Sequence, residues 1–267
     1  MGVDEPQFIT VGTGAQARPI AVRHRAGAAP GVLWLSGFRS DMTGTKAEAL
    51  AEWAATSGLA ATRMDYSGHG ASGGAFADGT VSRWLEEAKA VFDRFCQGPT
   101  IIVGSSMGGW IALLLTLAHV AEVGEAASRI RGLVLIAPAT DFTEELMWKQ
   151  RFTEEIRQAI LAQGRWEQPS AYGDEPYVIT RALIEDGRHH LLMDRPHRLG
   201  CPVTILQGRA DPDVPWSHAR RLVEALPDDD VTFTLVPDGD HRLSRSQDIA
   251  LLLKAVERAA RRPDSAA

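Results

Sequence analysis

The sequence has few cysteines, no excess of basic residues and no long hydrophobic run, and each of these shortages excludes a class of protein. Its 267 residues include two cysteines, Cys96 and Cys201, which are too far apart to indicate a metal-ligand pair or a disulfide framework. We expect both to be small buried apolar residues. The formal net charge is −6 and lysine and arginine form no run, so we expect no nucleic-acid partner. The longest mainly apolar run, residues 111–117, is too short to span a bilayer, which predicts no stable membrane insertion.

The first residues have neither the basic start and apolar stretch of a secretory signal nor the arginine-rich amphipathic stretch of a mitochondrial presequence. Together with the low cysteine content, this predicts a cytoplasmic protein. Hydrophobic residues make up 45% of the chain and charged residues 23%, as in ordinary globular proteins. We therefore expect a single domain over residues 1–267.

Strand-like and helix-like segments alternate along the chain. Apolar runs predict strands at 31–36, 59–64, 100–103, 131–136, 202–206 and 231–236. Helical patterns cover 44–57, 80–96, 107–121, 215–226 and 244–261. Residues 7–11 and 19–23 favour an antiparallel hairpin at the start. The alternation predicts an α/β fold with a mostly parallel central sheet and helices on both of its faces.

Residues 141–198 break this rhythm. They contain helical segments but no clear strand, and they include Trp148, Phe152, Trp166, Tyr172 and Tyr177. We interpret them as a small helical cap inserted between two strands, lying over the carboxyl edge of the sheet. The alternative is an ordinary pair of crossover helices, although such connections are usually much shorter.

Residues 104–108 (GSSMG) match the pattern G-x-S-x-G between a predicted strand and a predicted helix. This setting is typical of a nucleophile elbow, in which a tight turn exposes the serine hydroxyl and glycines avoid collisions with the backbone. The pattern identifies Ser106 as the candidate nucleophile. Ser105 is the alternative, but it stands at the wrong place in the turn.

A serine nucleophile needs a base, and the base needs an acid to orient it. The segment after strand 202–206 favours Asp211 as the acid, with Asp213 and Asp141 as alternatives and a plain turn role for all three still open. His241 follows the strand 231–236, where the base of such a fold is expected. The sequence thus predicts a catalytic triad of Ser106, Asp211 and His241.

The backbone N–H groups of Met107 and Phe38 are the candidate oxyanion hole, because they follow the nucleophile and the strand 31–36. The adjacent Gly37 also fits a plain turn. The aromatic residues of the insertion, with Met107, suggest an apolar acyl pocket. The pair 189–190 (HH) lacks a nearby carboxylate or third ligand, so we expect no metal site there.

Several short motifs strengthen this reading. They recur in order as GTKA (44–47), DYSG (65–68), VGSSMGGW (103–110), HHLL (189–192), CPV (201–203), DVPW (213–216) and DHR (240–242). Over about residues 30–255 the chain resembles the α/β-hydrolase family. Within it, the motifs are similar to those of the palmitoyl-protein thioesterases, also called mycophenolic acid acyl-glucuronide esterases, and their bacterial relatives. One departure is Ser36, which stands where the family commonly has histidine; the donor there is a backbone N–H, so the substitution does little harm.

The resemblance implies an acyl hydrolase without cofactor that acts on esters and thioesters, with its triad on Ser106, Asp211 and His241. We therefore predict a serine hydrolase that cleaves small-molecule esters or thioesters through an acyl-enzyme intermediate. Other chemistry on the same site (a lactonase, C–C hydrolase or acyltransferase) and a non-catalytic binding protein are the alternatives. Haloalkane dehalogenases and epoxide hydrolases need aspartate at the elbow, so Ser106 argues against both. The sequence gives no indication of the oligomeric state.

Overall fold

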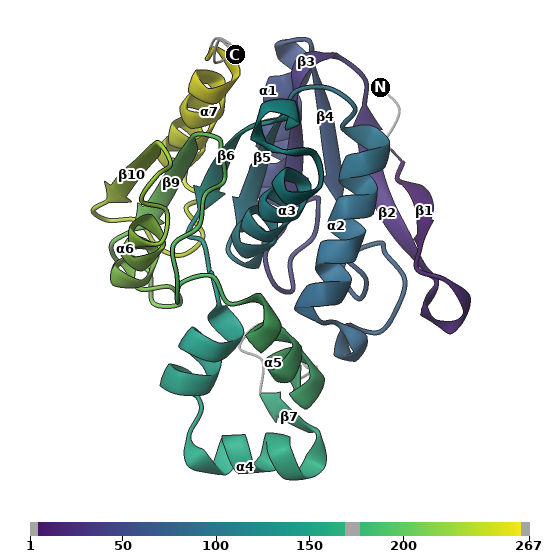
Figure 1. The fold of residues 1–267 in the computed structure, drawn as a ribbon, viewed down its shortest axis with the longest axis vertical. Coiled ribbons are helices and arrows are strands. Elements are labelled where there is room, and N and C mark those ends of the chain that lie inside the picture. Colours follow the sequence, from purple (N-terminus) through teal and green to yellow (C-terminus); the bar gives the residue numbers. More distant parts are fainter. Residues whose placement is uncertain (1–4, 169–176, 263–267) are drawn as a thin grey trace.

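The structure, a computed structural model, describes residues 5–168 and 177–262 (Figure 1). The predicted cap residue Tyr172 and the first four residues lie outside this range. Within it, eight strands form one sheet in the order β1-β2-β4-β3-β5-β6-β9-β10. Its strands are β1 (Gln7–Val11), β2 (Arg18–Arg25), β3 (Ala28–Leu35), β4 (Leu59–Met64), β5 (Thr100–Ser105), β6 (Ile130–Ile136), β9 (Val203–Gly208) and β10 (Val231–Val236).

The sheet is mostly parallel, as the alternation of segments predicts. β2 runs antiparallel to both β1 and β4, and the pairs from β4 to β10 are parallel. The predicted hairpin at the start of the chain is therefore confirmed as β1 and β2. Because parallel strands end at the same edge, the loops after β3, β5, β9 and β10 meet at the carboxyl edge of the sheet.

Helices cover both faces of the sheet (Figure 1). Alternate strand residues face opposite cores: Leu33 and Leu35 pack with α2, α3 and α6, whereas Val32 and Trp34 pack with α1 and α7. The five helices that cover the sheet begin and end within two residues of the predicted bounds. They are α1 (Thr45–Thr56), α2 (Val81–Phe95), α3 (Met107–Val123), α6 (Trp216–Glu224) and α7 (Ser246–Ala260), with short 3₁₀ turns η1 (Gly14–Gln16), η2 (Phe76–Asp78) and η3 (Glu125–Ala127).

The insertion between β6 and β9 projects beyond the carboxyl edge of the sheet (Figure 1). It contains the π-helix η4 (Thr143–Arg151), α4 (Glu154–Gln163), β7 (Arg165–Gln168), β8 (Tyr177–Thr180), α5 (Arg181–Gly187) and η5 (Arg188–His190). The expectation that it contains no strand is wrong, because β7 and β8 pair antiparallel. Each strand has only four residues, too few to show a clear alternation in sequence.

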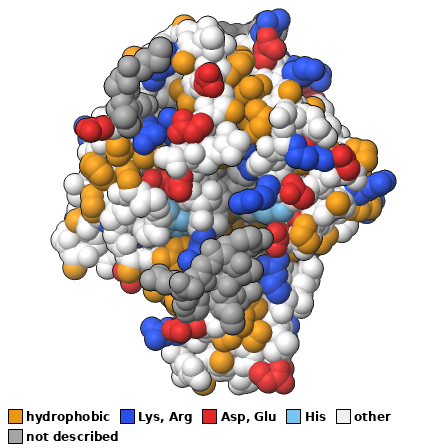
Figure 2. All heavy atoms as spheres, turned by 180° about the vertical axis from the view of Figure 1, so that it is seen from behind, with side chains coloured by type: hydrophobic (Ala, Val, Ile, Leu, Met, Phe, Trp, Pro, Cys, Tyr) orange, Lys and Arg blue, Asp and Glu red, His pale blue; other side chains and the backbone are white. Residues whose placement is uncertain are grey.

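Both cysteines are free and buried, as expected. Burial raises the pKa of the Cys96 thiol to about 11 and that of Cys201 to about 12, so both are protonated at neutral pH. Among the described residues, no helix combines the length and the apolar character needed to cross a membrane. Figure 2 shows one face of the molecule, where acidic and basic side chains lie interspersed.

Candidate active site

Ser106 lies in a sharp turn between β5 and α3, as the elbow motif predicts. Its φ of 53° and ψ of −118° are strained for a residue with a side chain. The strain persists because the backbone is fixed: the Ser106 N–H donates to the carbonyl of Ile136 at 2.9 Å. A Cβ on Gly104 would collide with the carbonyl of Gly108, and one on Gly108 with that of Leu35. The two glycines therefore allow β5, α3 and the end of β3 to meet closely.

The structure brings His241 to Ser106. Nε2 of His241 lies 3.1 Å from Oγ of Ser106, and Nδ1 lies 2.8 Å from Oδ2 of Asp211. His241 belongs to the loop after β10 and Asp211 to the loop after β9, so three separate strand ends supply the three groups. The His241 side chain is 22% exposed, whereas the Asp211 side chain is fully buried. Because the bond from Nδ1 keeps its proton on that nitrogen, Nε2 is free to accept the serine proton.

Hydrogen bonds hold the Asp211 carboxylate on both oxygens. Oδ1 accepts the backbone N–H groups of Asp213 at 2.8 Å and Val214 at 2.9 Å. Oδ2 accepts from Nε2 of Gln207 at 3.1 Å, in addition to His241. Gln207 is fully buried in β9, and the sequence reasoning assigned it no role. A polar amide directly after the predicted strand 202–206, four residues before the acid, is the sequence feature that could have indicated such a role.

The residues considered as alternative nucleophile and alternative acids lie elsewhere. His241 contacts Ser106, whereas the alternative nucleophile Ser105 is the buried last residue of β5. The exposed side chain of Asp213 lies 3.6 Å from the guanidinium of Arg151. Asp141 accepts backbone N–H groups of the insertion, and burial raises the pKa of its carboxyl to about 6. Of the three candidate acids, Asp211 is the one that His241 contacts.

Of the two predicted oxyanion donors, Met107 follows the serine directly in the chain, and Phe38 follows a glycine that lies against the serine. Met107 is the first residue of α3, where backbone N–H groups have no partner within the helix. Gly37 lies against the elbow: a Cβ placed on it would be 3.2 Å from the Ser106 Cβ and 3.3 Å from the Ser105 carbonyl oxygen. Phe38 follows directly after it. This close approach favours glycine at position 37. A glycine that served only the turn would not need to lie so near the elbow.

The ring of Phe38 belongs to a cluster of aromatic side chains. Its centroid lies 5.0 Å from that of Phe76, 5.9 Å from Trp84 and 5.5 Å from Phe142. Phe142 in turn packs edge-on against Trp110 of α3, at 5.6 Å. Since Phe142 lies at the start of the insertion, the cluster is mostly buried apolar packing that joins the loop after β3 to the insertion.

Polar contacts fasten the insertion at its two ends. The Asp141 carboxylate accepts the N–H of Leu192 at 2.9 Å and that of Met193 at 2.9 Å, so the chain returns to the point where it left. Arg151 of η4 donates to the carbonyl of Asp213 at 3.3 Å, next to the acid loop. These contacts fix where the insertion lies relative to the triad.

A third contact joins the insertion to α2. Oγ of Ser82 lies 2.7 Å from Oδ1 of Asp186 and 2.6 Å from Nε2 of His190. The Ser82 N–H also donates to Asp186, at 2.8 Å. The histidine and the aspartate are 4.0 Å apart. Because the serine hydroxyl donates to the carboxylate and accepts from the histidine, it is not activated as a nucleophile. Ser82, Asp186 and His190 together form a polar contact that links α2 to the insertion.

The donor atoms of Asp211, Asp213 and His241 lie within 4.8 Å of one another, which is close enough for a metal ion. However, the Asp211 oxygens already accept two backbone N–H groups, the Gln207 amide and His241. A cation would have to displace His241 from the carboxylate. The donor set therefore fits an acid–base pair better than a resident metal.

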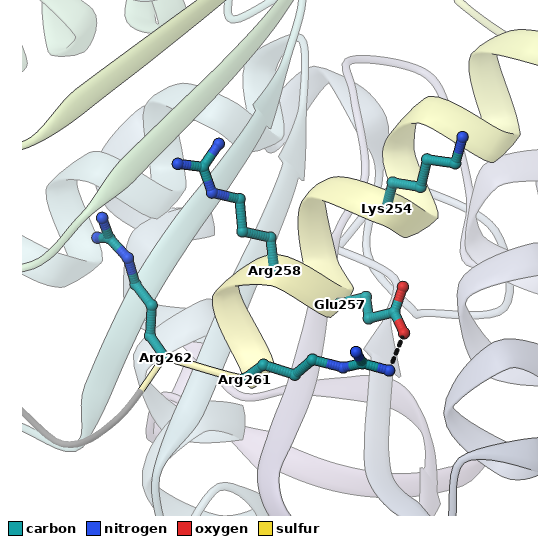
Figure 3. A pocket seen from close by; sticks show the side chains of 5 residues that line it. All are labelled: Lys254, Glu257, Arg258, Arg261 and Arg262. Carbon is teal, nitrogen blue, oxygen red and sulfur yellow. Dashed lines mark hydrogen bonds and ion pairs between the residues drawn. The ribbon is translucent and has the colours of Figure 1, made fainter.

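One surface hollow lies beside the end of α7 (Figure 3). It is lined by Lys254, Glu257, Arg258, Arg261 and Arg262. Arg261 pairs with Glu257 at 2.5 Å, and Arg262 pairs with Asp230. This end of α7 is at the opposite edge of the sheet from the insertion (Figure 1), so the hollow takes no part in the candidate active site.

The chain is similar to known proteins over most of its length. A family model described as serine aminopeptidase, S33 matches residues 31–248. The chain is 33% identical over 239 residues to the mitochondrial palmitoyl-protein thioesterase ABHD10 of Mus musculus, covering 89% of this chain and 77% of that protein. Among solved structures, a putative hydrolase from Agrobacterium vitis S4 has a TM-score of 0.89 and 52% identity, covering 96% of this chain and 98% of the other. Mouse ABHD10 has a TM-score of 0.82 and 31% identity, covering 95% and 97%.

Proposed function

The chain belongs to the serine aminopeptidase S33 family of α/β hydrolases, and on that premise we propose that it is a serine hydrolase that cleaves esters or thioesters through an acyl-enzyme intermediate. The observation that carries the proposal is the line of contacts from Ser106 Oγ through His241 to the buried Asp211, at 3.1 and 2.8 Å. This arrangement suits removal of the serine proton at neutral pH.

In the first half of the reaction, Oγ of Ser106 attacks the acyl carbonyl carbon while its proton passes to Nε2 of His241. Asp211 stabilises the resulting imidazolium. The N–H groups of Met107 and Phe38 hold the negative oxygen, and loss of one such donor typically reduces turnover ~10²–10³-fold. The bond to the alcohol or thiol then breaks, and the leaving group takes the proton from His241.

In the second half, water replaces the leaving group. His241 removes a proton from the water, whose oxygen attacks the acyl carbon of the ester on Ser106. The bond to Oγ breaks, the proton returns to the serine, and the carboxylic acid leaves. No cofactor is needed to balance either half. Since a thiolate is a better leaving group than an alkoxide, the same site serves thioesters and esters.

An apolar acyl group is the substrate class that we propose. The relative ABHD10 is named a palmitoyl-protein thioesterase. In this chain the half-buried Phe38, which follows Gly37 at the elbow, packs against the buried Phe142 at the start of the insertion. We also propose a cytoplasmic location, although the name of the relative ABHD10 includes the word mitochondrial. Fractionation of cells that express the tagged protein tests the location.

A fluorophosphonate probe tests the nucleophile. We expect one adduct, on the peptide that contains Ser106, and loss of ester hydrolysis by more than about 10³-fold in Ser106→Ala. Ser105→Ala is the matched control and keeps its labelling. A wild-type protein without an adduct would instead be a binding protein.

A substrate panel tests the acyl group. It contains acetyl, octanoyl and palmitoyl esters, the corresponding thioesters, a lactone and a diketone. We expect kcat/KM to rise from acetyl to the longer chains. Preference for acetyl esters would overturn the apolar pocket, and preference for the lactone or the diketone would overturn the ester or thioester assignment.

A further inference from the structure

Lys46 crosses from α1 to the loop that carries His241. It is the second residue of α1, and its Nζ donates to the carbonyl of Arg242 at 2.5 Å and to Oγ of Ser244 at 3.4 Å. Arg242 directly follows His241, so this contact fixes the peptide next to the catalytic base. The partners are 196 residues apart in sequence, and the contact joins the start of α1 to the loop after β10.

The position is an unfavourable one for a cation. The first turn of a helix carries a partial positive charge and prefers acidic residues. Burial and, to a lesser degree, the positive charge of Arg242 lower the pKa of Lys46 to about 8, against the opposing effect of the Asp240 and Asp248 carboxylates. These three charged groups come from the His241 loop and from α7. A lysine on the exposed surface has neither the unfavourable helix-start position nor the burial of Lys46. We therefore infer that the contact between Lys46 and the Arg242 carbonyl matters for the position of the His241 loop.

We propose that Lys46 is a positioning residue of the active site: its ammonium group holds the Arg242 carbonyl and thereby keeps Nε2 of His241 within reach of Ser106. The role rests on the proposed serine-hydrolase function. A charged N–H···O bond is roughly twice as strong as a neutral one. Deprotonation of Lys46 therefore loosens the loop without removing the side chain, and a misplaced base slows the chemical step more than it weakens substrate binding.

Deprotonation of Lys46 is expected to reduce turnover at alkaline pH. Because the lowered pKa is about 8, the ammonium is present at pH 7 and is lost as the pH rises through that value. We expect kcat to fall above about pH 8 while KM changes little.

The test compares Lys46→Arg, Lys46→Gln and Lys46→Met with the wild type, using a neutral short-chain ester between about pH 6 and pH 10. Arginine stays charged over this range, so we expect Lys46→Arg to retain most of its turnover and to lose the alkaline fall. We expect Lys46→Met to lose about 10–100-fold in kcat with KM within about twofold, and Lys46→Gln to fall between the two. Lys254→Met, on the exposed face of α7, is the matched control and keeps the wild-type profile.

Two results would overturn the proposal: an unchanged alkaline fall in Lys46→Arg, or a kcat for Lys46→Met and Lys46→Gln within about twofold of wild type. If Lys46→Met does not fold, judged by its thermal unfolding, the Arg and Gln variants decide. Ser106→Ala, assayed in parallel, separates this failure from that of the proposed function. Wild-type behaviour of the Lys46 series with an inactive Ser106→Ala overturns only the Lys46 role, whereas an active Ser106→Ala overturns both.

Discussion

The side-chain amide of Gln207 donates to Oδ2 of Asp211 at 3.1 Å, the same oxygen that His241 contacts. The two N–H groups of this amide are shared with the carbonyls of Gly208 at 3.1 Å and Val214 at 2.9 Å. Gln207 therefore fixes the carboxylate to the two ends of its own loop. An aspartate held on both oxygens presents one fixed position to the histidine, which a loop alone does not ensure.

Replacing Gln207 with leucine is expected to reduce kcat about tenfold and to lower the free energy of unfolding by about 1–3 kcal/mol, because buried carbonyls lose their donor. Steady-state kinetics and urea unfolding measure the two effects. Gln97→Leu, at an exposed position, is the control and leaves both unchanged. Wild-type kcat in Gln207→Leu would show that backbone N–H groups alone hold Asp211.

Gly37→Ala is expected to slow turnover by about 10²–10³-fold, since the new methyl group would press on the Cβ of Ser106 and displace the loop with the Phe38 donor. Ester hydrolysis at saturating substrate measures the loss. At Gly98 an added Cβ meets nothing within 4 Å, so Gly98→Ala should behave as wild type. Equal activity in the two variants would exclude the loop at 37–38 from the oxyanion hole.

Asp141→Asn is expected to stabilise the protein at neutral pH. The folded-state pKa of Asp141 is raised to about 6 from 3.8, so folding favours the protonated form. Ionisation of the buried Asp141 carboxyl lowers the free energy of unfolding. This destabilisation is absent below about pH 4, grows between pH 4 and 6 and reaches roughly 3 kcal/mol above pH 6. Asparagine keeps an oxygen for the N–H groups of Leu192 and Met193 and tolerates the φ of 56°.

Urea unfolding of Asp141→Asn at about pH 5 and pH 8 tests this linkage. The variant should exceed the wild type more at the higher pH, while Asp78→Asn, at an exposed site of η2, should follow the wild type throughout. A difference from wild type that does not depend on pH would contradict the raised pKa.

Ser82→Ala removes the hydroxyl between Asp186 and His190 and should loosen the insertion from α2. We expect a stability loss of about 1 kcal/mol, faster cleavage by protease within residues 141–198 and a higher KM for long acyl chains. The kcat for acetyl esters should not change, because the triad is not touched. Ser57→Ala, at the exposed end of α1, is the control. Unaltered proteolysis would show that the other contacts suffice.

The sequence predicts the sheet and its helices well because each segment carries its own signal. Local sequence determines three neighbouring features: the strand at 100–105, the tight GSSMG turn and the helix at 107–123. The spacing of the glycines is enough to indicate the tight turn. The order of Ser106, Asp211 and His241 then follows from the positions of the strand ends. Their catalytic role stays a prediction until the variants are assayed.

Other features depend on contacts that no local pattern contains. Lys46 meets the His241 loop across 196 residues, and Ser82 meets His190 across 108. The β7–β8 pair is too short to produce an alternation. Gln207 looks like the polar end of an apolar strand, and only the fold shows that its amide reaches Asp211. Buried polar partners of this kind are set by packing, which a single sequence does not display.

The hydrogen bonds from Leu192 and Met193 to Asp141 bring the first and last parts of the insertion to one point beside β6. A segment whose ends coincide can be lengthened, shortened or exchanged between homologous chains without altering the spacing of β6 and β9. Diversification of substrate range in such a lineage therefore requires no compensating change in the sheet. Chimaeras that carry the insertion of another family member, joined at 141 and 193, would inherit its acyl preference on an unchanged catalytic frame.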